Sequence, residues 1–257
     1  MFFKIHFGEF KYKRGVNMFN KFFIISVIFM MLFGNLEKVY AIDRVVIRSI
    51  TVDDPDRWYE NIYLIADKDG MDYKNFTVQV GDFGRGLYNF PKWINYSYDP
   101  KLYKEDLNAD KLEDIIIELV TGSGTGVSTK AIHILHQGNV GFYNFQEVPV
   151  EPIKDAIKRL VKMEQKGNEI TISIGKKNYV VDYSKFGYYT PVDRPGAGSI
   201  EEYIPKEGIL YGTANVFVTI PEANIGGLTV KYAWDGKMYK AESVTFEAAP
   251  YKSSRTK

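Results

Sequence analysis

Much of the chain alternates apolar and polar residues with a period of two. Residues 75–83 are the clearest case, because Phe76, Val78 and Val80 fall on one face. This period is that of a β-strand with one buried face. Further segments rich in β-branched and aromatic residues also predict strands. They are residues 44–52, 58–66, 93–98, 115–120, 130–135, 168–174, 178–183, 209–220, 226–234 and 238–246.

Residues 151–168 have the period of a helix instead. The apolar residues at helical spacing are Ile153, Ala156, Ile157, Leu160 and Val161. Pro152 suits a first helical turn and Gly167 suits the end of a helix. We therefore predict one helix through this segment.

Together these patterns predict a mainly β protein, of the α+β type with one clear helix and antiparallel sheets. The helix divides the strands into two groups, so we expect two β subdomains at residues 42–150 and 151–257. No sequence period of about 20 to 50 residues repeats, which does not favour a propeller or solenoid. In the second group, Asp235 and Gly236 predict a two-residue hairpin turn. The expected inward residues of the incoming strand are Val230, Tyr232 and Trp234.

Residues 1–41 predict a secretory signal peptide. Lys21 precedes an apolar run at residues 22–34, and Ala41 ends the one sequence here that fits signal-peptide cleavage. The run is shorter than the about 20 apolar residues that span a bilayer. We therefore expect a secreted, extracellular or cell-wall-associated protein with no stable membrane anchor after cleavage; an uncleaved anchor is the alternative.

Charge and cysteine content narrow the function classes. The chain has 33 Lys and Arg residues and 32 Asp and Glu residues. Residues 1–41 contain six of the basic and two of the acidic residues, so the remainder has 27 basic and 30 acidic residues. A net charge of about −3 without a basic cluster argues against nucleic acid as a partner. The chain has no cysteine, so an exported form must rely on packing or on bound ions for its stability.

An acidic loop lies within the first group of strands, before the predicted strand at residues 115–120. Its side chains alternate along the sequence, as Asp106, Asn108, Asp110, Leu112 and Asp114. Carboxylate, amide and backbone carbonyl oxygens are the ligands of a hard divalent cation, so the pattern predicts a calcium site that includes the Leu112 carbonyl. The alternative is a solvated acidic turn, because Asp and Asn also favour turns. We favour the ion.

Two departures from known calcium loops matter. The sixth position, where φ is positive and glycine is usual, is Lys111, which costs on the order of 1 kcal/mol and weakens the site. The twelfth position is Ile117, inside a predicted strand, whereas an EF-hand needs a carboxylate there and a following helix. An EF-hand or dockerin loop is therefore not expected.

The segment "DLNADKLEDIIIELVTGSGTGVSTKAIHIL" resembles the calcium loop and strand hairpin of FG-GAP and VCBS-type repeats, over about thirty residues and without the glycine. Such repeats occur in series, and here there is one. The wider pattern, with "EVPVEPIKDAIK" and "GGLTVKYAWDGKMYKAESVTF", is similar to an uncharacterised group of secreted proteins of bacilli. This resemblance implies a calcium loop on a β-sheet and a location outside the cell.

An aromatic-rich stretch precedes the loop and supplies a second binding hypothesis. Tyr88, Trp93, Tyr96 and Tyr98 lie within eleven residues. Strand packing is the leading explanation. Exposed rings also stack on sugars, so a cell-wall glycan or a surface protein is a possible partner.

The remaining candidates favour ordinary structure. The glycines of "TGSGTGV" precede a strand rather than a helix and predict a strand connection, not a phosphate loop. His133 and His136 would lie on opposite faces of a strand. Nothing in the spacing brings together the carboxylates Glu151, Asp155, Glu201 and Glu202.

These observations favour a secreted, calcium-binding, non-catalytic β module. A glycan-binding module that uses the aromatic stretch is the first alternative. A hydrolase with dispersed catalytic residues is the second, and the sequence assigns no catalytic residue.

Overall fold

The computed structural model describes residues 43–141, 143–187, 195–218 and 223–250. The expected signal peptide at residues 1–41 lies outside the described residues. Strands make up most of the described chain, so the prediction of a mainly β protein with antiparallel sheets is confirmed.

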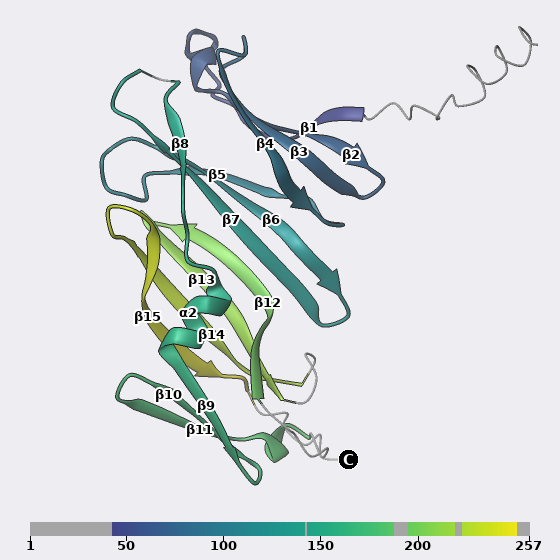
Figure 1. Cartoon of the computed structure of the whole chain (residues 1–257), viewed down its shortest axis with the longest axis vertical. Helices are drawn as coiled ribbons and strands as arrows, with labels where there is room; N and C mark the ends of the chain where they lie inside the picture. The colour runs from purple at the N-terminus through teal and green to yellow at the C-terminus, as the bar shows by residue number, and fades with distance from the viewer. Residues whose placement is uncertain (1–42, 142, 188–194, 219–222, 251–257) are drawn as a thin grey trace, which may run out of the picture. The chain divides into compact units, whose positions relative to one another are not determined.

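The first sheet has four strands in sequence order, β1-β2-β3-β4, all antiparallel (Figure 1). Its strands are β1 (Asp43–Ile50), β2 (Ile62–Asp69), β3 (Asp72–Val80) and β4 (Gly86–Asn95). A 3-10 helix, η1 (Pro55–Glu60), connects β1 to β2. The alternating apolar residues of β3 are buried, as predicted: Phe76, Val78 and Val80.

The largest sheet has eight strands. They are β5 (Lys101–Glu105), β6 (Asp114–Gly124), β7 (Val127–Gln137), β8 (Phe145–Val148), β12 (Pro195–Lys206), β13 (Ile209–Val218), β14 (Asn224–Trp234) and β15 (Tyr239–Ala248). The order is β15-β14-β13-β12-β7-β6-β5, and β8 pairs with residues 134–137 of β7, outside this order. Neighbours are antiparallel except β7 and β12, which meet in parallel where Ser128 pairs with Ile200.

This sheet contains strands from both expected subdomains. β7 comes before residue 150 and β12 after it, and the two are neighbours. The chain from Asp43 onward groups as one compact unit.

The third sheet has three antiparallel strands in the order β11-β10-β9. They are β9 (Val161–Lys166), β10 (Glu169–Ile174) and β11 (Lys177–Asp182), and a second 3-10 helix, η2 (Tyr183–Phe186), follows. The single α-helix of the described chain, α2 (Ile153–Leu160), comes directly before β9.

The predicted helix is correct at its start and wrong beyond Leu160. Pro152 is the N-cap, one residue before the first turn in which the sequence placed it. Val161–Lys166 forms β9 instead, because its apolar and polar residues also alternate with a period of two and the segment pairs fully with β10. Gly167, with a φ of 61°, forms the β9–β10 turn rather than the helix end.

The predicted C-terminal hairpin is present, but its turn is longer than predicted. Trp234 pairs with Tyr239, so four residues separate β14 from β15 rather than two. The Asp235 carboxylate accepts hydrogen bonds from the backbone N–H groups of Lys237 and Met238, which stabilises the wider turn. The inward face of β14 is as predicted: Val230 and Tyr232 are buried and Trp234 packs against the same core.

The described residues contain two hydrophobic clusters, and β6 contributes to both. Ile115 and Ile117 join the cluster formed with the four-stranded sheet, whereas Ile116 joins the cluster formed with α2 and the C-terminal strands. All three isoleucines have no exposed surface. β6 is therefore covered on both faces.

None of the helices in the described part of the chain is long and apolar enough to cross a membrane.

We predict that Ile116→Ala lowers the free energy of unfolding by about 2 to 5 kcal/mol, because it removes buried methyl groups and leaves a cavity. Ile94→Ala is the matched control, because Ile94 lies on β4 and is 43% exposed; its loss should stay below about 1 kcal/mol. Equilibrium denaturation in urea measures both. Equal losses would contradict the placement of β6 between two cores.

Candidate functional site

The acidic loop lies where β5 ends and β6 begins. Glu105 pairs with Asp114, so residues 106–113 form the connection between two neighbouring antiparallel strands. The Asp106 carboxylate accepts hydrogen bonds from the backbone N–H groups of Asp110 (3.3 Å) and Lys111 (2.9 Å). The short Asp and Asn side chains thus fold the backbone around themselves, as such residues do in turns.

Two further side chains stabilise the loop from inside. The Asn108 Oδ1 atom accepts from the Asp110 N–H at 3.0 Å, and the Asp110 Oδ1 atom accepts from the Leu112 N–H at 2.8 Å. The Asn108 side-chain amide also donates to the other Asp110 oxygen at 3.1 Å. Every second residue from Asp106 to Asp110 therefore directs its side chain toward the loop backbone.

The backbone at the sixth position has the conformation that the sequence pattern predicts. Lys111 has a φ of 73°, and Ala109 has a φ of 62°. Both values lie in the left-handed region, which disfavours residues with a Cβ atom. The loop therefore keeps its tight path despite the missing glycine.

Asp114 differs from the other loop carboxylates because it is completely buried. Its Oδ2 atom accepts from the Leu107 N–H at 3.1 Å, and its Oδ1 atom accepts from the Gln137 N–H at 3.3 Å. Burial, with smaller contributions from the nearby carboxylates of Asp110 and Asp106, raises the pKa of Asp114 to about 7, although the two backbone hydrogen bonds act to lower it. Two backbone donors do not fully replace water around this charge.

His136 on β7 completes the surroundings of the loop, and the sequence analysis did not predict this role. Its Nδ1 atom lies 3.3 Å from the Asn108 Nδ2 atom, and its Nε2 atom lies 2.8 Å from the Tyr239 hydroxyl. Burial lowers the pKa of His136, so the ring is neutral at pH 7. The glycine turn after β6 was the available signal, because a hairpin closed there brings His136 alongside the start of β6.

No lysine or arginine of the described residues forms an ion pair with Asp106, Asp110 or Asp114. The one ionisable partner is His136, whose Nε2 atom lies 3.8 Å from the Asp114 Oδ2 atom. Because His136 is neutral, it does not balance the charge. The three carboxylates of this loop therefore have no cationic side-chain partner among the described residues.

The donor set fits a hard divalent cation. Carboxylate and amide oxygens with free lone pairs are what Ca²⁺ prefers, and each oxygen that accepts one hydrogen bond retains a second lone pair. In the described residues, no three Asp, Glu, His or Cys side chains are grouped closely enough to hold a metal ion as they stand. Binding by Asp106, Asp110 and Asp114 would require their side chains to turn toward a common point.

The four candidate aromatic rings do not form one exposed surface. Trp93 is 7% exposed and lies between the rings of Phe90 and His133. The Tyr88 hydroxyl donates to the Tyr143 carbonyl and accepts from the Phe145 N–H. Its ring packs against the hydrophobic cluster formed with the four-stranded sheet.

The other two rings are accessible to solvent. Tyr96 is 38% exposed and Tyr98 is 60% exposed. A sugar-stacking surface would therefore have to rely on these two tyrosines rather than on all four rings.

The other candidates occupy ordinary structural positions. The glycine segment forms the β6–β7 hairpin, as predicted, with Gly124 paired to Val127. His133 bonds to Glu147 at 2.7 Å and stacks on Trp93, whereas His136 contacts Tyr239. The two histidines thus contact different hydrophobic clusters, consistent with opposite faces of the strand.

The dispersed carboxylates are held by separate partners. Glu151 forms a bidentate salt bridge with Arg159, and Glu202 forms a salt bridge with Lys101 at 2.5 Å. Glu201 is 7% exposed, and burial raises its pKa.

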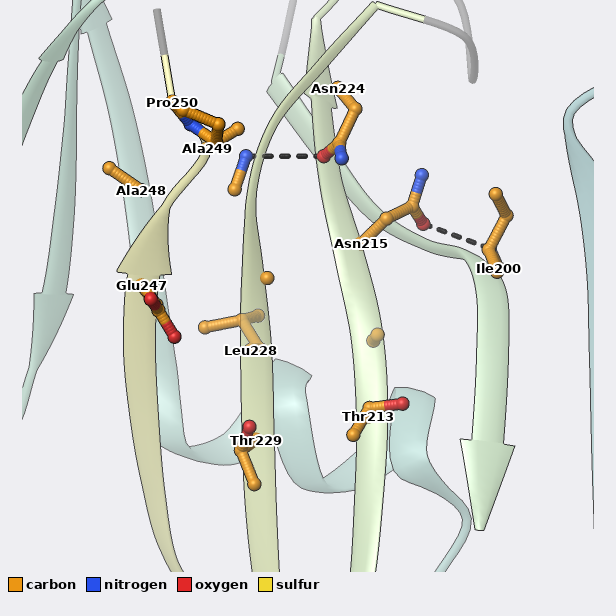
Figure 2. A pocket seen from close by; sticks show the side chains of 13 residues that line it. Ile200, Thr213, Asn215, Asn224, Leu228, Thr229, Glu247, Ala248, Ala249 and Pro250 are labelled. Carbon is orange, nitrogen blue, oxygen red and sulfur yellow. Dashed lines mark hydrogen bonds between the residues drawn. The ribbon is translucent and has the colours of Figure 1, made fainter.

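An open groove with both polar and apolar lining residues lies on β13, β14 and β15, and the sequence did not predict it. It encloses about 450 Å³, and Figure 2 shows its side chains from all three strands. The Asn215 carboxamide oxygen accepts from the Ile200 N–H at 2.8 Å, and the Asn224 oxygen accepts from the Gly226 N–H at 3.1 Å. The first bond joins β13 to β12, and the second is local to β14.

A smaller hollow of about 190 Å³ lies beside the acidic loop. Lys111 and Leu112 line it together with Tyr59, Lys104 and Glu113. Lys104 pairs with Glu113 at 2.7 Å, so the charges in this hollow largely balance.

Comparison of the chain with models of protein families, with curated proteins and with solved structures gives no match. The function must therefore be argued from the residues of the site.

We predict that, without divalent cations, stability falls as pH rises from about 4 to about 7. The pKa of Asp114 is about 7 in the folded chain, against about 4 in an unfolded chain. The folded state thus retains a proton that the unfolded state releases, and this stabilisation is complete below about pH 4 and lost as pH rises through 7. Asp114→Asn removes the titration. Urea denaturation of both proteins from pH 4 to 8 tests this, and a constant difference between them would contradict it.

Proposed function

We propose that this chain is a calcium-binding, non-catalytic β module that works outside the cell or at the cell surface. The acidic loop is the site, with Asp106, Asn108, Asp110 and Asp114 as side-chain ligands and the Leu112 carbonyl as the fifth. The wider setting rests on the signal-peptide pattern of residues 1–41.

The observation that carries the proposal is the buried charge of Asp114. A buried carboxylate is costly unless a positive charge or a proton compensates it. The described residues supply no lysine or arginine as an ion-pair partner, and the two nearest loop carboxylates add like charge. A divalent cation would offset all three charges at once, whereas in an ordinary solvated turn only a proton compensates Asp114.

A second feature supports an ion rather than a plain turn. Lys111 keeps a φ of 73° in a loop whose other side chains already bond the backbone. A strained residue persists where its surroundings require the path. The backbone conformation of this loop lets the side chains of Asp106, Asn108 and Asp110 all bond to its N–H groups.

The stabilisation expected from the ion is modest. An ion that binds only the folded chain contributes RT ln(1 + [L]/Kd). Extracellular modules bind calcium with Kd values of roughly 0.1 to 1 mM. The contribution at about 1 mM calcium is then about 0.4 to 1.4 kcal/mol, so the ion adjusts the stability of a fold whose cores are already formed by packing.

We predict that 10 mM calcium raises the melting temperature by about 3 to 10 °C, because a gain of roughly 1.4 to 2.7 kcal/mol acts on a domain of this size. Asp110→Asn should abolish most of this shift, since it removes one charged ligand and keeps the side-chain shape. Thermal melting and calorimetric titration with calcium measure the two effects.

Glu113→Gln is the matched control for this experiment. It removes the same charge from the same loop, but Glu113 pairs with Lys104 and is not among the proposed ligands. The variant should keep the calcium shift. Neither binding heat nor a melting shift in the wild type at 10 mM calcium would refute the proposed function.

We also predict that Lys111→Gly raises the melting temperature with and without calcium. Glycine adopts a positive φ without the cost that a Cβ atom brings, about 1 kcal/mol, which its greater freedom in the unfolded chain partly offsets. Exposed Lys176, in the β10–β11 turn, provides the control variant Lys176→Gly, which lacks this relief. Melting curves of both variants measure the effect. A lower melting temperature for Lys111→Gly would contradict the claim that Lys111 is strained.

A further inference from the structure

The orientation of the Asn108 side chain is fixed by its neighbours. The Asp110 N–H donates to one end of the side chain at 3.0 Å, so that end is the oxygen. An Asp110 carboxylate oxygen lies 3.1 Å from the other end, so that end is the NH₂ group. The two contacts agree, and the amide is therefore not interchangeable with its flipped form.

This orientation determines which nitrogen of His136 carries the proton. The Asn108 NH₂ group lies 3.3 Å from His136 Nδ1 and can only donate, so Nδ1 must be the acceptor. The proton of the neutral ring is then on Nε2, which donates to the Tyr239 hydroxyl at 2.8 Å. Tyr239 is 1% exposed, and Trp234 packs edge-on against the imidazole ring at 4.6 Å. The ring is therefore held at both nitrogens and across its plane.

We propose that His136 is a positioning residue of the calcium site: by accepting from the Asn108 NH₂ group, it acts together with the Asp110 contacts to keep the Asn108 oxygen directed into the loop. This inference rests on the proposed function. An amide that turns over presents NH₂ instead of oxygen, and NH₂ cannot bind a cation. The imidazole itself is a poor direct ligand, because Ca²⁺ takes oxygen ligands. Residues that orient ligands in this way typically change metal affinity by about 10- to 100-fold when replaced.

The test is a double-mutant cycle on calcium affinity with the purified protein. His136→Phe keeps a flat ring and removes both nitrogens, and it should raise the Kd for calcium about tenfold. Asn108→Asp provides the second arm, because a carboxylate offers oxygen in either orientation. In the Asn108→Asp background, His136→Phe should change the Kd by less than about twofold. A purely structural role would weaken binding equally in both backgrounds.

Two further measurements keep the inference testable if His136→Phe folds poorly. Tyr239→Phe removes only the hydroxyl that holds Nε2 and should raise the Kd about threefold, whereas His133→Phe, on the same strand but away from the loop, should leave it unchanged. Nitrogen-15 NMR of the calcium-free wild type should show His136 with a bare Nδ1 and a protonated Nε2. The opposite tautomer would overturn the positioning role.

The outcomes separate this inference from the proposed function. A wild-type protein that binds no calcium refutes both. A wild type that binds calcium, with equal losses or no loss from His136→Phe in the two backgrounds, refutes only the role of His136. The proposed site of Asp106, Asn108, Asp110 and Asp114 would then stand without it.

Discussion

The burial of β6 on both faces is the constraint on which the rest of the structure depends. Ile115 and Ile117 pack into one core and Ile116 into the other, and none of them touches solvent. A shift of one residue would move Glu118, which is buried and paired with Lys101, to the face that packs into the other core, and it is therefore strongly disfavoured. The register of β6 fixes the position of Asp114, its first residue, and so the end of the acidic loop.

Because Asp114 belongs to this strand, it is removed from water together with the isoleucines. Backbone donors from Leu107 and Gln137 compensate part of the cost. The remainder can be offset by a proton, which the raised pKa reflects, or by a cation. Proton and cation would then compete for one carboxylate. The rest of the loop decides which is favoured at neutral pH, since Asp106 and Asp110 increase the attraction for a divalent ion more than for a single proton.

Local patterns in the sequence predict those parts of the fold that are decided locally. The strand at Phe76, the Pro152 helix start and the positive φ at Lys111 all follow from residue type and spacing. The end of the helix could not be predicted in this way. Residues Val161–Lys166 fit both the helical period and the strand period of two, and pairing with β10 selects the strand. The role of His136 also depends on register: Ile115 pairs with Leu135 only because the β6–β7 hairpin contains an irregularity after Val120. No spacing rule along the sequence reveals that shift.

The acidic loop is held by contacts from distant parts of its own chain. Remote strands provide these contacts. The Gly208 N–H, in the turn between β12 and β13, donates to the Glu105 carboxylate at the end of β5. Tyr239, at the start of β15, holds His136 against Asn108. The Gly208–Glu105 and Tyr239–His136 contacts each join residues 103 positions apart, so the geometry of a short acidic segment depends on the assembly of the eight-stranded sheet. An isolated peptide of residues 103–127 would contain every proposed ligand and none of this support.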